Sequence, residues 1–264
     1  MNGIYNDTLL QALRQGKAAI AKDIDWMILN RINPAGRNYC AYYHNRELLA
    51  HRAFPAIVAE LFENGIRVGV PFSTVEEVKQ GIAYNERQAA DEQKVRFFVS
   101  EIEEYGETGS TPENFRATLH ESYELACAQG IPLGVYQGWT KETQYDSIVT
   151  NADFLFLHAY RKSSLMDDPG ELYAYCSSRL AMAANSAERA GKHFPISIIF
   201  SCEPDFGMDY FRVNPWNSAF HIFMRDYLRA ATGKMKQWLN VSGMQIYSSQ
   251  YGQIAKPDSP RIFT

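Results

Sequence analysis

Short apolar runs alternate along the chain with longer stretches in which apolar positions recur at helical spacing. The apolar runs predict buried strands over residues 25–30, 39–44, 67–72, 95–100, 133–139, 153–160, 195–201 and 243–248. The longer stretches predict helices over about 6–22, 47–63, 111–129, 169–190 and 216–232. This alternation is typical of βα units around a parallel sheet.

Turn and capping residues mark several of the expected element ends. Gly65 would end a helix, because glycine tolerates a left-handed backbone. Ser73 with Glu76 matches a capping box at the start of another helix. Thr111, followed by Pro112, predicts the cap and first residue of the next one.

The length of 264 residues suits one eightfold barrel, although two ordinary domains would also fit it. We predict an α/β protein, a TIM (β/α)8 barrel, with 1–264 as a single barrel domain. Only eight residues separate the first two expected strands, too few for a crossover helix. We therefore expect the first βα unit to be irregular or incomplete. The competing fold, a doubly wound sheet, usually has a glycine-rich phosphate loop, which this sequence lacks.

Charge and hydropathy limit the classes of partner that we expect for this chain. Lys plus Arg number 26 and Asp plus Glu 30, and no basic run of the kind that binds nucleic acid is present. No stretch reaches the roughly 18 apolar residues of a membrane helix, and the first residues do not form a signal-peptide pattern. We expect no cofactor, since no nucleotide, haem or flavin signature appears. The balance suits an enzyme that acts on a neutral small molecule or a sugar.

The four cysteines are Cys40, Cys127, Cys176 and Cys202. None is part of a C-x-x-C pair, which argues against a cysteine zinc site. We expect four free thiols in the core, with a disulfide pair as the alternative.

In a barrel of this type, polar residues just past each strand face the active site. Glu101 and Glu103 follow the fourth expected strand and project the same way, because strand side chains alternate. Neighbouring carboxylates raise the pKa of at least one of them, which prepares a general acid near neutral pH. The alternative is a solvated acidic loop.

Glu203 is the second candidate carboxylate. It follows the seventh expected strand, and Pro204 fixes the turn after it. Glycosidases place two carboxylates on either side of the bond that they cleave, so the predicted catalytic set is Glu103, Glu101 and Glu203. The alternative is that Glu203 forms a structural salt bridge with Arg161 or Arg212.

Further strand-end residues could contact a substrate. The predicted substrate-binding set is Gln137, Trp139, His158, Tyr160 and Tyr247. Sugar rings stack on aromatic faces, although aromatic residues in a barrel mouth can equally be packing. A lone histidine at a strand end is more often a hydrogen-bonded structural residue than a ligand.

Three segments resemble the chitinase-like glycoside hydrolases: residues 99–105, 152–160 and 242–248. The resemblance implies that Glu103 is the proton donor and that Glu101 is its acidic neighbour. It also implies that Tyr160 orients the substrate and that Tyr247 lies beneath the sugar. Glu101 and Val99 stand where that family usually has Asp. This departure favours a two-glutamate mechanism, or a barrel that has lost catalysis, over substrate-assisted chemistry on an N-acetyl sugar.

We therefore expect a glycoside hydrolase-like enzyme with a carbohydrate substrate. One alternative is a metal-dependent barrel, similar to sugar isomerases or endonucleases, with ligands from Glu101 or Glu103, His158, Glu203 and Asp205. The other is a non-catalytic carbohydrate-binding barrel that keeps the aromatic mouth.

Overall fold

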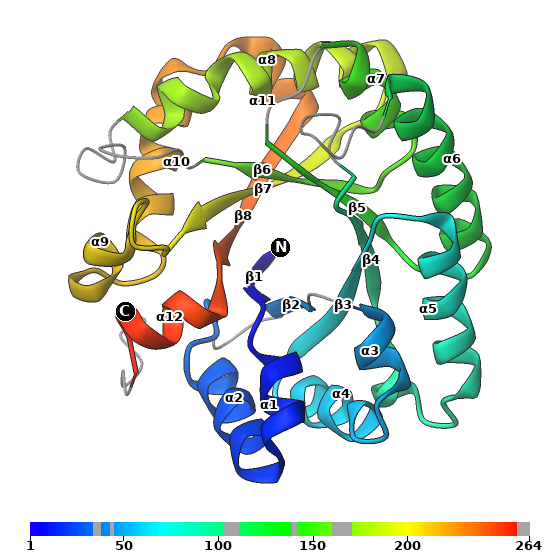
Figure 1. Ribbon diagram of the computed structural model, residues 1–264. Coiled ribbons are helices and arrows are strands. Elements are labelled where there is room, and N and C mark those ends of the chain that lie inside the picture. Colours follow the sequence, from blue (N-terminus) through cyan, green and yellow to red (C-terminus); the bar gives the residue numbers. More distant parts are fainter. Residues whose placement is uncertain (34–37, 43–44, 103–110, 139–141, 160–170, 258–264) are drawn as a thin grey trace.

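The computed structural model describes residues 1–33, 38–42, 45–102, 111–138, 142–159 and 171–257. Within them, parallel strands β1 to β8 pair in chain order and close into a barrel, which is seen from one end in Figure 1. The strands are β1 (Asn2–Asn6), β2 (Asn38–Tyr42), β3 (Ile66–Phe72), β4 (Phe97–Ser100), β5 (Leu133–Gln137), β6 (Phe154–His158), β7 (Phe194–Ser201) and β8 (Leu239–Tyr247). The predicted TIM barrel is confirmed.

The helices form a ring outside the strands (Figure 1). They are α1 (Leu9–Gln15), α2 (Lys17–Leu29), α3 (Asn45–Ala50), α4 (Phe54–Glu63), α5 (Val75–Arg87), α6 (Pro112–Ala128), α7 (Glu142–Thr150), α8 (Leu172–Ala190), α9 (Met208–Val213), α10 (Ser218–Ala230), α11 (Gly233–Trp238) and α12 (Ser249–Ala255), with a 3-10 turn at Asp91–Gln93. None of the helices described here is long and apolar enough to cross a membrane.

The first βα unit differs from the sequence prediction. The strand predicted over 25–30 is wrong, because these residues continue α2 to Leu29, and Asn30 is its C-cap. The first strand is β1, which ends at Asn6, where the predicted helix was expected to begin; no element was predicted over residues 2–5. Two helices, α1 and α2, then connect β1 to β2, with a break at Gly16, whose φ is 102°. The first unit is therefore complete, with two helices in place of one; the close strand spacing that suggested an incomplete unit came from the misplaced strand.

Two other helix boundaries differ from the sequence prediction because of local sequence features. The helix predicted over 47–63 is two helices, α3 and α4, and Pro55 lies in the first turn of α4, where its missing N–H costs nothing. The capping box lies one residue later than predicted: Thr74 accepts from the N–H of Glu77, whose carboxylate accepts from the N–H of Thr74. The cap at Thr111 is confirmed.

The barrel interior is packed by alternate strand residues. The buried cluster comprises Tyr5, Ala41, Phe97, Val99, Tyr136, Phe154, Phe156 and Ile199, with Met1, Tyr39 and Tyr247 packed against it. Glycines make room for two of the rings: Gly69 is in register with Phe97, and Gly134 with Phe154. A much larger cluster fills the space between the strands and the helices. The interior is thus filled with side chains, as expected for eight strands.

All four cysteines are free thiols. Cys40, Cys176 and Cys202 are buried, but Cys127 is exposed, so the prediction of a core position is wrong for this residue. Cys127 lies in the last turn of α6, on the side that faces away from the buried Phe115, Leu119 and Ala126.

Candidate active site

Three tyrosines line the end of the barrel where the strands finish. The ring centroid of Tyr5, in β1, lies 5.1 Å from that of Tyr247 and 5.5 Å from that of Tyr136. Tyr5 and Tyr136 are buried, whereas Tyr247 is partly exposed. The peptide bond between Tyr247 and Ser248 is cis. This tyrosine cluster is the wall against which Glu101 lies.

Glu101 lies directly after β4 and is held by Tyr5. The Tyr5 hydroxyl donates a 2.5 Å hydrogen bond to Glu101 Oε1, and the backbone N–H of Glu101 donates to Phe72 O. Burial raises the pKa of Tyr5, and the negative charge of Glu101 raises it further. The phenol therefore stays protonated and donates, which stabilises the ionised form of Glu101.

Glu203 follows β7 and is partly buried. Its Oε2 accepts a 2.8 Å hydrogen bond from Ser201 Oγ, which also accepts from the Glu203 N–H at 3.1 Å. Burial raises the pKa of Glu203; the Ser201 hydrogen bond opposes that rise, while the charges of Asp7 and Asp205 add to it. Glu203 thus keeps its proton to a higher pH than a solvated glutamate does.

A salt bridge between Glu203 and Arg212, the alternative from the sequence, is not formed. Arg212 instead donates to Asp209 at 2.7 Å. The other proposed partner, Arg161, lies outside the described residues.

A continuous chain of contacts connects the two carboxylates. Ser201, which binds Glu203, is in register with Tyr247, and the Cys202 N–H donates to Tyr247 O at 2.6 Å. Tyr247 contacts Tyr5, which binds Glu101. The ends of β4, β7, β8 and β1 therefore bring Glu101 and Glu203 to the same end of the barrel, as the sequence predicted.

His158 ends β6, and its ring centroid lies 6.4 Å from that of Tyr136. Burial lowers the pKa of His158 to about 3, with a further contribution from the positive charge of Arg179. Arg179 is itself buried in α8 and donates a 2.9 Å hydrogen bond to Gly138 O, just after β5. His158 is therefore a neutral imidazole beside the tyrosine wall.

Gln137 is not brought together with these residues. It is buried at the end of β5 and in register with Leu157, which belongs to the core between strands and helices. Its neighbour Tyr136 faces the barrel interior, so alternation turns Gln137 toward the helices.

Three predicted site residues, Glu103, Trp139 and Tyr160, lie outside the described residues. Their proposed roles stay predictions. Asn30, which the sequence placed at a strand end, instead accepts from Trp216 Nε1 at 3.3 Å as the C-cap of α2.

Sequence reasoning missed Tyr5 and a polar network at the end of β1. In this network the buried Asp23 accepts from Asn6 and Gln253, each at 2.9 Å, and from Thr8. Asp7 accepts from Ser249 Oγ at 3.0 Å, which ties α12 to the barrel. The polar run after Ile4 and Tyr5 was the available signal for a strand end.

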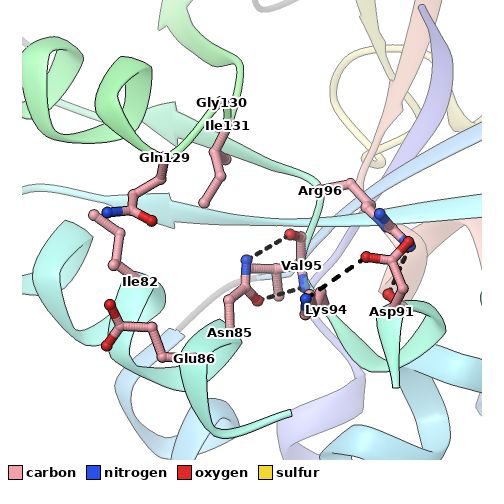
Figure 2. A pocket seen from close by; sticks show the side chains of 10 residues that line it. All are labelled: Ile82, Asn85, Glu86, Asp91, Lys94, Val95, Arg96, Gln129, Gly130 and Ile131. Carbon is pink, nitrogen blue, oxygen red and sulfur yellow. Dashed lines mark hydrogen bonds and ion pairs between the residues drawn. The ribbon is translucent and has the colours of Figure 1, made fainter. Parts of the chain in front are cut away.

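Among the described residues, no three His, Cys, Asp or Glu side chains come together in an arrangement that could hold a metal ion. Two cavities formed by described residues lie at the opposite, amino-terminal ends of the strands. One, of about 320 Å³, is lined by residues of α5 and by those that precede β4 and β5 (Figure 2). The other, of about 530 Å³, opens at the base of the barrel.

No protein-family model and no curated protein sequence matches the chain. Solved structures do resemble it. A family 18 chitinase from Crocus vernus has 11% identity, covers 85% of this chain and 87% of its own, and has a TM-score of 0.56. The catalytic domain of a GH26 endo-β-1,4-mannanase from Bacillus sp. JAMB-750 has 10% identity, covers 80% of this chain and 67% of its own, and has a TM-score of 0.52. A putative fructose-1,6-biphosphate aldolase from Coccidioides immitis has 11% identity, covers 98% of this chain and 78% of its own, and has a TM-score of 0.54.

Identities this low show a shared fold. The resemblance to TIM-barrel glycoside hydrolases, including chitinases, is confirmed at that level.

Proposed function

We propose that this chain is a glycoside hydrolase-like enzyme that cleaves a glycosidic bond with a pair of glutamates. The pair is Glu203 after β7 and a glutamate after β4, either Glu101 or Glu103. The observation that carries the proposal is the chain of contacts from Glu101 through Tyr5, Tyr247 and Ser201 to Glu203. It holds two carboxylates in different electrostatic states at the end of the barrel where TIM-barrel chemistry occurs.

Different protonation states are what the reaction requires. One carboxyl group protonates the leaving oxygen, and the other is ionised and acts as nucleophile or general base. The resemblance to chitinases implied a proton donor after β4. Among the described residues, the contacts support the opposite division, because the Tyr5 hydrogen bond stabilises ionised Glu101 while burial raises the pKa of Glu203.

Two observations support a substrate class: the partly exposed side chain of Tyr247 at the carboxyl-terminal end of the barrel, here called the mouth, and the similar solved structures. Tyr247 offers a partly exposed aromatic face on which the apolar C–H side of a sugar can stack. The chitinase and the mannanase are named for polysaccharide hydrolysis, and they share the barrel. We propose a carbohydrate substrate.

The first experiment is a hydrolysis screen with 4-nitrophenyl glycosides and with soluble chitin, mannan and arabinan fragments. On any substrate that is turned over, Glu101→Gln should lower kcat/KM by about 10²–10⁴-fold, and Glu203→Gln should do the same on the oligosaccharide fragments, whose leaving groups need a general acid. Glu60→Gln, an exposed glutamate on α4, is the matched control and should leave activity unchanged. Thermal unfolding of each variant separates lost chemistry from lost folding.

Azide separates the two roles. If the reaction retains configuration, Glu101→Ala with azide should give a glycosyl azide, because azide replaces the missing nucleophile. Glu203→Ala should instead keep most of its activity toward substrates with good leaving groups. Saturable sugar binding without turnover would refute the enzymatic proposal in favour of a binding barrel. Full activity in both Gln variants would refute the proposal that Glu101 and Glu203 are the catalytic pair.

A further inference from the structure

We infer that the cavity at the base of the barrel is a second binding site, which takes a small molecule with a flat apolar body and a carboxylate group. This base cavity has a floor of Tyr39, Phe97 and Phe154 and a wall of Phe62, Arg67 and Arg96. Its volume of about 530 Å³ falls in the range of small-molecule sites. It lies at the amino-terminal ends of the strands, so it is separate from the proposed catalytic mouth.

The floor is a rigid aromatic surface. The ring of Phe97 packs edge-to-face with Tyr39 at 5.5 Å and with Phe154 at 6.0 Å between centroids. Gly69 and Gly134 fix two of these rings, because a side chain at either position would overlap the ring of Phe97 or Phe154. Phe97 and Phe154 are themselves buried, so they hold in place the partly exposed ring of Tyr39, on which a planar apolar group can stack without first ordering the site.

The wall brings two positive charges to one aromatic ring. The Arg67 Cζ lies 3.8 Å from the centroid of Phe62, and the Arg96 Cζ lies 4.7 Å from it. Stacking on a common ring holds two like charges near each other, and an anion between them would relieve their repulsion. The planar forks of two arginines suit a carboxylate.

Two aspartates, Asp91 and Asp153, also line the base cavity, and each has a lysine near it. Asp91 pairs with Arg96 at 2.8 Å and more loosely with Lys94 at 3.7 Å (Figure 2). The Asp91 side chain is 70% exposed. An ion pair this exposed is weak, so an anionic ligand can compete with Asp91 for Arg96. The other aspartate, Asp153, accepts from the Leu133 N–H at 2.8 Å and lies close enough to Lys192 to interact with its charge.

Chemistry thus divides the base cavity into an apolar half and a cationic half. The aromatic floor favours a ring over a hydroxyl-rich sugar, which would need many hydrogen-bond partners. The paired guanidinium groups favour a carboxylate over a neutral head group. An aromatic or similarly flat carboxylate satisfies both halves.

The test is calorimetric titration with 2-naphthoate, compared with 2-naphthamide, which keeps the ring but lacks the charge. We expect 2-naphthoate to bind saturably and at least about tenfold more tightly than the amide. Arg67→Met and Arg96→Met should each weaken 2-naphthoate binding about tenfold or more. Arg96→Lys keeps the charge but loses the fork, and it should fall between wild type and Arg96→Met.

Glu203→Gln is the control from the other end of the barrel and should bind 2-naphthoate like wild type. Thermal unfolding shows whether each variant folds. If an Arg→Met variant does not fold, the affinity difference between 2-naphthoate and 2-naphthamide, together with the affinity of Arg96→Lys, tests the inference. Absence of saturable binding up to millimolar concentration, equal affinity for acid and amide, or loss of binding in Glu203→Gln would each overturn the inference. The proposal of glycoside hydrolysis would be untouched, because its assay probes the mouth.

Discussion

Adding one methyl group inside the barrel tests the glycine–aromatic packing. A Cβ on Gly134 would lie 1.9 Å from Phe154 Cε2 and 2.4 Å from its Cζ, far inside van der Waals contact. The two residues are paired in register on β5 and β6. Phe97 and Phe156 restrain the ring of Phe154 on two sides, at 6.0 and 5.2 Å between centroids. Gly134→Ala must therefore displace backbone or ring.

Overpacking a well-packed core typically costs about 1–3 kcal/mol, and the confined ring places Gly134→Ala at the upper end, about 3 kcal/mol. For a protein of this size that loss corresponds to a fall in Tm of roughly 6–12 °C. Urea unfolding monitored by circular dichroism and by tryptophan fluorescence measures the change and tests whether unfolding is two-state.

A double-mutant cycle identifies the cause. Phe154→Leu removes the ring edge that the new methyl group would meet, so in that background Gly134→Ala should cost less than half as much. The interaction free energy should then be at least about 1 kcal/mol. Gly233→Ala is the control: no atom lies within 4 Å of its added Cβ, and the change should be neutral or slightly stabilising. Additive losses in the cycle, or a Gly134→Ala variant as stable as wild type, would refute the packing argument.

Three further predictions concern the mouth and the thiols. Tyr5→Phe keeps the ring but deletes the hydrogen bond to Glu101, so kcat/KM for any hydrolysed glycoside should fall about 10–100-fold, while Tyr84→Phe, far from the mouth, should not change it. The pKa of His158 is about 3, below the ordinary 6.5, so its neutral form stabilises the fold above pH 6.5, and this contribution is lost as pH falls toward 3. NMR should show the His158 ring signals constant from pH 8 to 5, and a titration near 6.5 would contradict this. Ellman's reagent should titrate one thiol, Cys127, in the native protein and four after denaturation; rapid modification of a second native thiol would contradict the burial of the others.

The sequence pattern was sufficient for the barrel and for the position of both carboxylates. Strands β2 to β8 are apolar runs flanked by turn signals, so periodicity locates them. The strand that was missed, β1, has only Ile4 and Tyr5 as large apolar residues among Asn and Gly. The run predicted in its place, 25–30, is apolar because α2 buries Trp26 and Met27 against the core.

These two errors cancelled in the strand count. Glu101 and Glu203 were therefore assigned to the correct strands, four and seven. Tyr5 could not be found, because its role depends on β1 being a strand and on a contact across 96 positions of sequence. Gln137 shows a different limit of sequence reasoning. Its place at the end of β5 was predicted, but whether its side chain faces the barrel interior or the helices depends on the register of β5, which the sequence did not give.

The barrel closes by pairing its first strand with its last. Gly3 and Ile4 pair with Gln245 and Ile246, and the hydroxyl groups of Thr8 and Ser249 meet at 2.9 Å across 241 positions. During translation, the edge of β1 opposite β2, and the Asp7 and Thr8 side chains that bind Ser249, have no partner until β8 and α12 have left the ribosome. Contacts of such long sequence separation slow folding, so the open edge of β1, and later that of β7, stays available to chaperones or to other chains until β8 pairs with both.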